Sequence, residues 1–273
     1  MTLGAALVTG AARGIGRAIT LRLAKDGYSV ALCDIGHRDQ LASLRSEIAA
    51  LGQNSFECMA DVSKEADVRD AVNRTVTELG GLDVMVANAG IYYPMPLIEG
   101  AERFCIPRPT DLTAFTATLQ DWDAHFNVNG KGVFLCYKYA ALAMIQQGRG
   151  GRIIGASSLA GKQGVTNLDL SIYSATKFTV RALTQAAVWT IQSTLAQELK
   201  PHGITVNAYA PGLIATDMSK EFIKEAQARG DTDTLRRSGN PEDIAGLVSY
   251  LASPESRFIT GQSISINGGI FCD

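Results

Sequence analysis

Residues 5–16 read Ala5-Ala6-Leu7-Val8-Thr9-Gly10-Ala11-Ala12-Arg13-Gly14-Ile15-Gly16. The apolar run at the start predicts a buried strand, and the amphipathic residues after it predict a helix. Three glycines between a strand and a helix let the chain turn, let a phosphate approach the backbone, and let the helix pack close to the sheet. The free N–H groups at the start of such a helix favour an anion. The stretch therefore predicts a dinucleotide site, with a tight structural turn as the simpler alternative.

Short apolar runs and longer amphipathic stretches alternate along the rest of the chain. Predicted strands cover Ala5–Thr9, Ser29–Cys33, Ser55–Met59, Val84–Ala87, Arg152–Ala156, Thr205–Tyr209 and Ser263–Ile266. Predicted helices cover Gly16–Lys25, Gln40–Leu51, Lys64–Leu79, Trp122–Gln147, Ser174–Leu199 and Pro241–Ala252. Several strands are continuous in Val, Ile, Leu and Ala, which is typical of a parallel sheet covered on both faces. Repeated strand–helix–strand units predict an α/β fold, a single Rossmann-type domain over residues 1–273 with a doubly wound parallel sheet and helices on both faces.

The composition excludes several classes of protein. The formal net charge is −2, from 25 Lys and Arg against 27 Asp and Glu, so no basic surplus exists to bind nucleic acid. No apolar run reaches the roughly 18 residues of a membrane span. Five scattered cysteines predict reduced thiols of a cytoplasmic protein. The histidines predict no metal site, because they are too scattered, and each is expected to be a surface or capping residue: His37, His125 and His202.

An acidic residue after the second predicted strand bears on cofactor choice. Asp34 lies 18 residues beyond Gly16, where a carboxylate accepts hydrogen bonds from the adenosine ribose and repels a 2′-phosphate. It favours NAD over NADP. Arg13 and Arg38 are possible phosphate partners that favour NADP, or ordinary surface arginines.

Tyrosine, lysine and serine residues in the second half of the chain predict a reacting site. Tyr173 and Lys177 are four residues apart and so share one face of a helix. A nearby ammonium stabilises a phenolate and lowers its pKa from about 10. Ser158 follows the predicted strand Arg152–Ala156, and strand ends of open parallel sheets border the ligand crevice. The alternatives are a chance Tyr-x-x-x-Lys and a serine that only caps a helix.

Taken in order, these motifs resemble those of the short-chain dehydrogenase/reductase family over nearly the whole chain. The resemblance rests on Thr9–Gly16, Asp61-Val62, Asn88-Ala89-Gly90, Val128-Asn129-Gly130, Ser158, Tyr173, Lys177, Pro211-Gly212 with Thr216, and Asn267-Gly268-Gly269. It implies cofactor contacts at Gly10, Arg13, Gly14, Ile15, Gly16, Asp34, Asp61, Val62, Asn88, Ala89, Gly90, Tyr173, Lys177, Pro211, Gly212, Ile214 and Thr216.

The resemblance also implies hydride transfer between a nicotinamide and a carbonyl or secondary alcohol. Tyr173 is expected to donate a proton to the carbonyl oxygen, which Ser158 polarises. Lys177 is expected to lower the pKa of Tyr173 and to bind the nicotinamide ribose. Asn129 is expected to hold a water that links Lys177 to solvent. No metal is implied.

Within the family, Tyr173–Gly212 and Tyr250–Ser263 look most like diacetyl/acetoin reductases, also called butanediol dehydrogenases, which commonly use NAD. The expected substrate is a small diketone, hydroxyketone or vicinal diol. Alternatives are a 3-oxoacyl-thioester reductase, a polyol or sugar dehydrogenase, and a nicotinamide-binding sensor or scaffold without turnover. Expected pocket-lining residues, or plain packing residues, are Leu159, Gln163, Leu213 and Met218.

Two segments depart from the family pattern. The loop near 100–117 is longer than is usual inside a compact domain. Val188–Leu195 interrupts the helix after Tyr173, and eight extra residues rotate a helix face by about 80°. The family resemblance implies a homo-oligomer, a tetramer or a dimer, through this helix and the one carrying Asn129. We therefore expect the second insertion to alter that interface.

Overall fold

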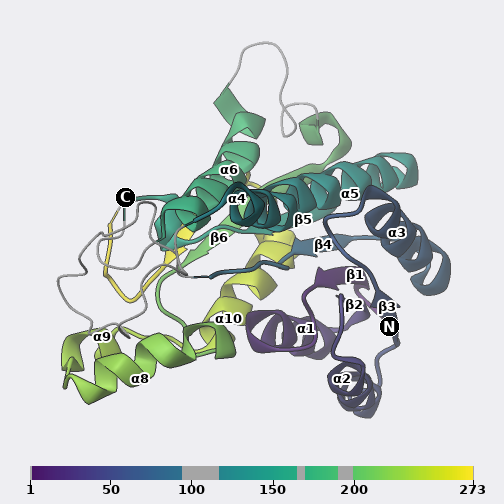
Figure 1. The fold of residues 1–273 in the computed structure, drawn as a ribbon. Helices are drawn as coiled ribbons and strands as arrows, with labels where there is room; N and C mark the ends of the chain where they lie inside the picture. The colour runs from purple at the N-terminus through teal and green to yellow at the C-terminus, as the bar shows by residue number, and fades with distance from the viewer. Residues whose placement is uncertain (1, 94–116, 165–169, 190–198, 273) are drawn as a thin grey trace.

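A computed structural model describes residues 2–93, 117–164, 170–189 and 199–272 (Figure 1). One seven-stranded parallel sheet has the order β3-β2-β1-β4-β5-β6-β7. The strands are β1 (Gly4–Thr9), β2 (Tyr28–Asp34), β3 (Ser55–Met59), β4 (Val84–Ala87), β5 (Gly151–Ala156), β6 (Ile204–Pro211) and β7 (Ser263–Ile266). The predicted Rossmann-type fold class is confirmed. The strand order reverses between β1 and β4, and the carboxyl ends of these strands meet there.

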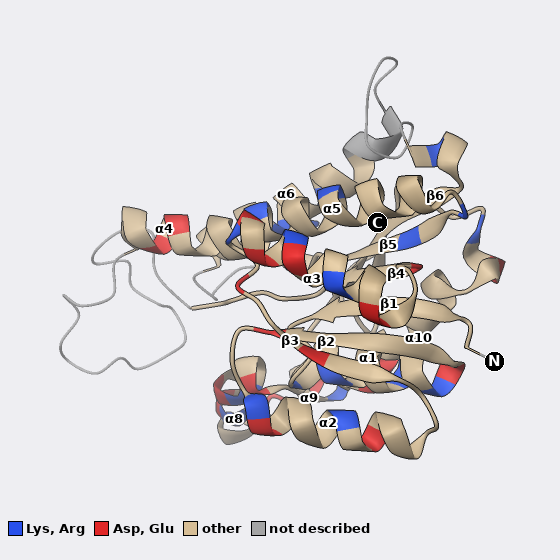
Figure 2. Cartoon of the chain, turned by 90° about the vertical axis from the view of Figure 1, so that its right-hand side faces the viewer, with Lys and Arg blue, Asp and Glu red and all other residues tan. Residues whose placement is uncertain are grey.

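Helices cover both faces of the sheet. On one face lie α1 (Gly14–Asp26), α2 (Arg38–Ala50) and α10 (Pro241–Ala252), and on the other lie α3 (Glu65–Leu79), α5 (Val133–Gln147) and α6 (Ser171–Trp189) (Figure 1). Two further helices follow β6, namely α8 (Lys220–Ala228) and α9 (Thr232–Arg236). Figure 2 shows Lys and Arg interleaved with Asp and Glu along α8. Within the described residues, no helix is both long and apolar enough to cross a membrane.

The helix predicted over Trp122–Gln147 is a composite in the structure. It begins as α4 (Leu119–His125), widens into a π-helical segment (Phe126–Gly132) and continues as α5. Thr118 and Asp121 form a capping box that starts it, because the Thr118 hydroxyl accepts from the Asp121 N–H and the Asp121 carboxylate accepts from the Thr118 N–H. The register of the predicted helix is therefore interrupted at the segment that carries Asn129.

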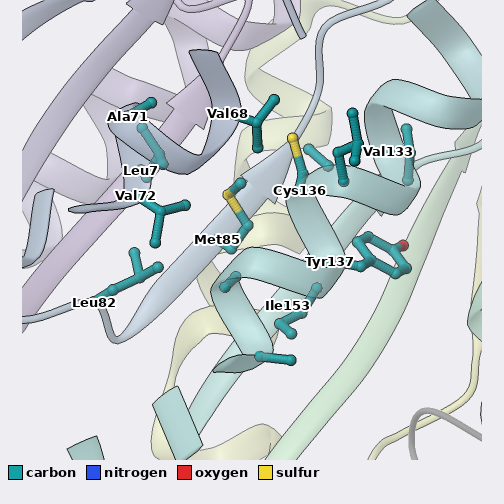
Figure 3. Close-up of a cluster of buried hydrophobic side chains, with 14 of the residues drawn as sticks. Leu7, Val68, Ala71, Val72, Leu82, Met85, Val133, Cys136, Tyr137 and Ile153 are labelled. Atoms are coloured by element: carbon teal, nitrogen blue, oxygen red, sulfur yellow. The ribbon is translucent and has the colours of Figure 1, made fainter. Parts of the chain in front are cut away.

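The core explains why the strands are apolar without alternation. On β1, β4 and β5 the side chains of Leu7, Met85 and Ile153 enter one buried cluster, with α3 and α5 (Figure 3). The next residue on each strand enters the cluster on the opposite face, with α1 and α10. Both faces of each strand therefore need apolar side chains, as buried parallel strands do.

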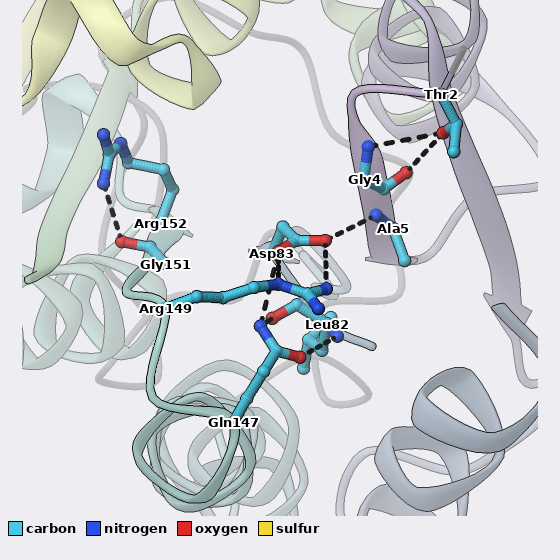
Figure 4. Close-up of polar contacts among 9 residues, drawn as sticks. All are labelled: Thr2, Gly4, Ala5, Leu82, Asp83, Gln147, Arg149, Gly151 and Arg152. Atoms are coloured by element: carbon cyan, nitrogen blue, oxygen red, sulfur yellow. Dashed lines mark hydrogen bonds and ion pairs between the residues drawn. The ribbon is translucent and has the colours of Figure 1, made fainter. Parts of the chain in front are cut away.

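An ion-pair network joins the amino ends of β1 and β4 to the end of α5. The Asp83 carboxylate accepts from the Ala5 N–H at 2.8 Å and from Arg149 Nε and Nη2 at 2.8 and 3.0 Å (Figure 4). Gln147 Nε2 donates to the same carboxylate and its Oε1 accepts from the Leu82 N–H. Since Asp83 is largely buried, its charge depends on these donors.

We expect Asp83→Asn to lower the free energy of unfolding by about 2 kcal/mol, because a bond to a charged group is lost, and hence the melting temperature by roughly 4–8 °C. The matched control is Asp233→Asn, which breaks the exposed i,i+4 pair with Arg237 and should cost less than about 0.5 kcal/mol. Thermal unfolding followed by circular dichroism measures both. Equal shifts in the two variants would contradict the assigned role of the network.

Candidate active site

The glycine loop between β1 and α1 is shaped for a phosphate. Gly10 and Gly14 have φ of 65° and 54°, and a Cβ on Gly16 would stand 2.0 Å from the carbonyl oxygen of Gly10. Arg13, at the N-cap of α1, makes no side-chain hydrogen bond to the helix. The first N–H groups of α1 therefore face the loop without a side-chain cap, which is the arrangement that favours a pyrophosphate. The predicted loop residues Gly10, Arg13, Gly14, Ile15 and Gly16 thus fit a dinucleotide.

Asp34 is the last residue of β2 and its carboxylate is already engaged by this chain. Oδ2 accepts from the Ala12 N–H at 3.1 Å, and Oδ1 accepts from the Gly36 N–H at 3.3 Å. The His37 imidazole lies 3.4 Å from the same Oδ1. The carboxylate therefore ties the glycine loop to the end of β2 and holds a negative charge beside it.

A side-chain junction joins the carboxyl ends of β1 and β4. The Thr9 hydroxyl accepts from the N–H groups of Asn88 and Ala89, both at 3.0 Å. In return, Asn88 Nδ2 donates to the carbonyl oxygens of Thr9 and Gly10 at 2.8 and 3.3 Å. The side chain of Asn88 thus fixes the start of the glycine loop.

Tyr209 is a member of this junction that the sequence motifs did not reveal. It is 1% exposed on β6, and its hydroxyl donates to Asn88 Oδ1 at 2.8 Å. Since Nδ2 of Asn88 must face the two carbonyls, the Tyr209 bond supplies the donor that its Oδ1 needs. The only signal in the sequence is a tyrosine among the small and aliphatic residues of its strand.

The segment after β6 closes against the glycine loop. The Gly212 N–H donates to the Ile266 carbonyl, which holds the Pro211-Gly212 turn on the end of β7. Further on, Thr216 Cγ2 lies 3.5 Å from the position of a Cβ on Gly14, and Asp217 forms an exposed ion pair with Arg13 at 3.7 Å. Ile214 is buried in the core cluster that the sheet forms with α1 and α10. The predicted residues Pro211, Gly212, Ile214 and Thr216 therefore belong to one segment, and its Thr216 faces the loop.

The Asp61-Val62 pair follows β3. The carboxylate of Asp61 accepts from the N–H and hydroxyl of Ser63, at 3.0 and 2.7 Å. Burial raises the pKa of Asp61, but the Ser63 hydrogen bonds and the Lys64 charge outweigh burial, so that its pKa lies below the ordinary value. Val62 is buried, and its Cγ2 would stand 2.9 Å from a Cβ on Gly132. The pair thus connects the β3 edge of the site to the π-helical segment.

The end of β5 positions the tyrosine and the lysine of α6. Ser157 Oγ donates to the carbonyl of Lys177 at 3.1 Å, and Lys177 Nζ donates to the carbonyl of Ala156 at 2.8 Å. A Cβ on Gly161 would stand 2.6 Å from the Lys177 carbonyl carbon, so the turn after Ser158 must be this close to the helix. Lys177 Nζ lies 5.5 Å from the centroid of the Tyr173 ring. The structure therefore brings Ser158, Tyr173 and Lys177 together.

Ser158 caps a short turn and also contacts Tyr173. Its Oγ accepts from the Ala160 N–H at 3.1 Å, as the cap of the short turn Leu159–Gly161. The same side chain forms a hydrogen bond with Tyr173. The cap fixes the hydroxyl at the point where the Tyr173 phenol reaches it.

Burial changes the ionisation of both groups on α6. Burial raises the pKa of Tyr173 to about 12, although the Ser158 hydrogen bond lowers it. Burial also lowers the pKa of Lys177 to about 8. The net pKa of Tyr173 lies above its usual value because desolvation outweighs the Ser158 hydrogen bond. The Lys177 ammonium is directed at the Ala156 carbonyl, and its expected lowering of the Tyr173 pKa stays a prediction.

Asn129 lies in the π-helical segment and is fully buried. Its Oδ1 accepts from the Ile91 N–H at 2.8 Å, and its Nδ2 donates to the Ile91 carbonyl at 2.9 Å and to the Thr176 hydroxyl at 3.1 Å. A Cβ on Gly90 would stand 3.3 Å from Asn129 Oδ1 and 3.4 Å from Lys177 Nζ. Asn88, Ala89 and Gly90 thus run from the glycine loop to Asn129 and Lys177.

The sequence is similar to those of known proteins over nearly the whole chain. The family model described as enoyl-(acyl carrier protein) reductase matches residues 10–270. The short-chain dehydrogenase/reductase eriH of Hericium erinaceus is 44% identical over 97% of this chain and 97% of its own length. The 3-oxoacyl-[acyl-carrier-protein] reductase FabG of Staphylococcus epidermidis is 38% identical over 97% of this chain and 98% of its own length. The chain belongs to the short-chain dehydrogenase/reductase family.

Solved structures of short-chain dehydrogenase/reductases have the same fold. One from Mycobacterium marinum gives a TM-score of 0.84 at 33% identity, covering 100% of this chain and 97% of that one. Acetoin dehydrogenase YohF of Salmonella typhimurium gives a TM-score of 0.78 at 30% identity, covering 98% of this chain and 96% of that one. A short-chain dehydrogenase from Burkholderia cenocepacia, solved with NADP, gives a TM-score of 0.79 at 35% identity, covering 97% of this chain and 96% of that one. This short-chain dehydrogenase/reductase is accordingly an NAD(P)-dependent oxidoreductase that acts on CH–OH groups.

Two further predictions concern residues around the short-chain dehydrogenase/reductase site. Leu159 is buried, Gln163 and Leu213 are half-buried, and Met218 is 50% exposed, so that pocket lining stays a prediction for them. The long loop near 100–117 and most of Val188–Leu195 lie outside the described residues. Among the residues that are described, no group of three His, Cys, Asp or Glu side chains could hold a metal ion.

The Tyr209–Asn88 bond gives a testable prediction. Tyr209→Phe removes one buried hydrogen bond that orients Asn88, and should weaken NADH binding about 5- to 10-fold while kcat changes less than about twofold. The control is Tyr137→Phe, since the Tyr137 hydroxyl is equally buried but bonds Thr184 on α6. That variant should bind NADH like the original protein. Fluorescence titration with NADH measures both affinities, and an equal loss in both variants would contradict the link from Tyr209 to the glycine loop.

Proposed function

We propose that this enzyme interconverts a ketone and a secondary alcohol with NAD(H), through Tyr173, Ser158, Lys177 and Asn129. The observation that carries the proposal is the placement of Tyr173 between Ser158 and Lys177 on the same sheet edge as the glycine loop. A nicotinamide bound there supplies the hydride. The residues of the chain position the reactants and supply a proton.

Each of these residues has a distinct part in the reduction. Tyr173 donates its phenolic proton to the carbonyl oxygen, and its high pKa keeps that proton in place near neutral pH. Ser158 donates a hydrogen bond to the same oxygen and stabilises the negative charge that develops there. Lys177, whose pKa of about 8 leaves it mostly protonated near neutral pH, binds the nicotinamide ribose and faces the Tyr173 ring. Asn129 holds Ile91 and Thr176 and thereby fixes the helix beside Lys177.

Removal of the phenol tests this assignment. Tyr173→Phe should lower kcat by about 10²–10⁴-fold, the usual contribution of a positioned acid, with NADH affinity within about twofold. Tyr250→Phe, on the exposed side of α10, is the control and should leave both unchanged. The loss of NADH absorbance measures turnover. Retained activity in Tyr173→Phe would refute the mechanism.

A small diketone or hydroxyketone of the diacetyl/acetoin type is the proposed substrate, in line with the likeness to acetoin dehydrogenase. A 3-oxoacyl thioester is the second candidate, because the identity to FabG is higher, at 38%. The test is NADH oxidation with diacetyl, acetoin, an acetoacetyl thioester and a ketose. Preference for the thioester would replace the first candidate by the second. NADH binding without turnover of any compound would favour a sensor or scaffold.

Preference for NAD over NADP is proposed from the charge of Asp34. Solved relatives include one with NADP and a 7α-hydroxysteroid dehydrogenase with NADH, which is 28% identical with a TM-score of 0.81 and covers 98% of this chain and 94% of that one. Asp34 keeps a carboxylate at the end of β2, whereas Arg13 is paired with Asp217. We also propose that the enzyme is cytoplasmic and forms a homo-oligomer.

Asp34→Asn keeps the size of the side chain and removes the charge that repels a 2′-phosphate. The ratio of kcat/KM for NADPH to that for NADH should therefore rise at least about tenfold, which corresponds to about 1.4 kcal/mol. Asp39→Asn makes the same change of net charge on the exposed first turn of α2 and is the matched control. Steady-state kinetics with both cofactors measures the ratio. No change in Asp34→Asn relative to the control would show that Asp34 does not select the cofactor.

A further inference from the structure

His125 is a buried residue, contrary to the expectation of a surface or capping histidine. It is the last residue of α4 and only 1% of it is exposed. It lies one helical turn before Asn129, so the two side chains share one face of the helix. This face is directed at the segment that follows Gly90.

The hydrogen bonds of His125 define its tautomer. The Tyr93 N–H donates to Nε2 at 3.3 Å, so Nε2 must carry a lone pair. Nδ1 lies 2.8 Å from the Asp121 carbonyl oxygen, which only accepts, so Nδ1 must carry the proton. The ring is therefore neutral with its proton on Nδ1, and both nitrogens are used. The Tyr93 ring also meets the imidazole edge-on, with centroids 5.6 Å apart.

His125 and Asn129 together fasten a short piece of backbone. Asn129 holds both the N–H and the carbonyl of Ile91, and His125 holds the N–H of Tyr93. The backbone on each side of Tyr92 is thus attached to one helix. These hydrogen bonds restrain the backbone of Tyr92, so that mainly its side-chain torsions stay free to change.

The side chain of Tyr92 packs on the proton donor of the proposed reaction. Its ring meets that of Tyr173 edge-on, with centroids 5.3 Å apart and an interplanar angle of 64°. The phenolic oxygen of a tyrosine lies on the axis of its last torsion, so its position depends on the tilt of the whole side chain and not on rotation of the ring. The Tyr173 ring is contacted by Tyr92 and Lys177, and its phenol by Ser158. Loss of the Tyr92 contact therefore lets the Tyr173 side chain tilt over a wider range and moves its phenolic oxygen.

We infer that His125 is a positioning residue for catalysis, which holds Tyr93 so that Tyr92 packs against Tyr173 and orients its phenol. The inference rests on the proposed function, in which Tyr173 donates the proton. His125 touches neither Tyr173 nor the reacting atoms and acts through the backbone of residues 91–93. A misplacement of about 1 Å at a reacting group can lower a rate by about 10²-fold.

A double-mutant cycle tests the inference. His125→Phe keeps an aromatic ring but loses the acceptor for Tyr93, and Tyr92→Leu removes the ring that touches Tyr173. Each should lower kcat by about 10- to 100-fold, measured with the carbonyl compound that the original enzyme reduces fastest, and leave NADH affinity within about twofold. The double variant should be no slower than the slower single variant, because both changes interrupt one chain of contacts.

His125→Gln provides a rescue, because its side-chain oxygen accepts a hydrogen bond as Nε2 does. It should recover kcat to within about threefold of the original enzyme. A merely structural role predicts something else: kcat effects that multiply in the double variant, or a lower melting temperature with kcat unchanged. Either result would overturn the inference, as would failure of the glutamine to restore kcat. If Tyr173→Phe also keeps full turnover, the proposed mechanism is what has failed.

Two measurements need no substrate. Nitrogen NMR of the imidazoles should show one histidine with its proton on Nδ1, and that signal should be missing in His125→Phe. Hydrogen exchange of the Tyr93 amide, measured with NADH bound, should be at least about tenfold faster in His125→Phe than in the original enzyme. A proton on Nε2, or unchanged exchange at Tyr93, would overturn the inference even if no carbonyl compound is turned over.

Discussion

The amide of Asn88 is the contact on which the rest of the site depends. It lies where the strand order reverses, so its neighbours on β1 and β4 lead to opposite halves of the sheet. Through Nδ2 it fixes the first turn of the glycine loop, and through the next two residues it leads to Asn129 and Lys177. One side chain therefore ties the glycine loop to the segment that reaches Asn129 and Lys177. Tyr209 orients that amide from β6, and so connects a third strand to the same point.

Burial is the second constraint, because it sets the charges available for chemistry. The Tyr173 phenol stays protonated near neutral pH, which suits a proton donor, and Lys177 loses part of its charge. An ammonium that is desolvated in this way gains from any acceptor, and the Ala156 carbonyl is the one within reach. The end of β5 thus holds the lysine in place before any ligand binds. Ser157, which follows β5 directly, also fixes the backbone of α6, because its hydroxyl donates to the Lys177 carbonyl.

Much of the fold could be predicted from the sequence, because parallel strands covered on both faces must be continuously apolar. Val84–Ala87 has the predicted bounds for this reason. The edge strands Ser55–Met59 and Ser263–Ile266 also have the predicted bounds, although their sequences alternate between polar and apolar residues. The π-helical segment Phe126–Gly132 could not be predicted, because its asparagines and glycines lower the helical propensity without specifying that the helix widens there. It arises where the helix passes the end of the sheet, and Val62 packs directly on Gly132 there. That packing depends on the tertiary fold and leaves no periodic pattern in the sequence.

The candidate site also has residues that the sequence could predict and residues that it could not. Glycines, Tyr173 and Lys177 stand at spacings that a local element imposes, so a motif contains them. Tyr92, His125 and Tyr209 act through partners far along the chain. The Tyr209 bond depends on the registers of β4, β5 and β6, and the His125 bond depends on the direction of a loop. One local clue did exist for His125: it stands four residues before Asn129 on a helix, on the face that the asparagine must turn toward the site. A polar ring that is buried on that face needs hydrogen-bond partners, and the Tyr93 N–H, two residues beyond the Ile91 that Asn129 holds, is one of them.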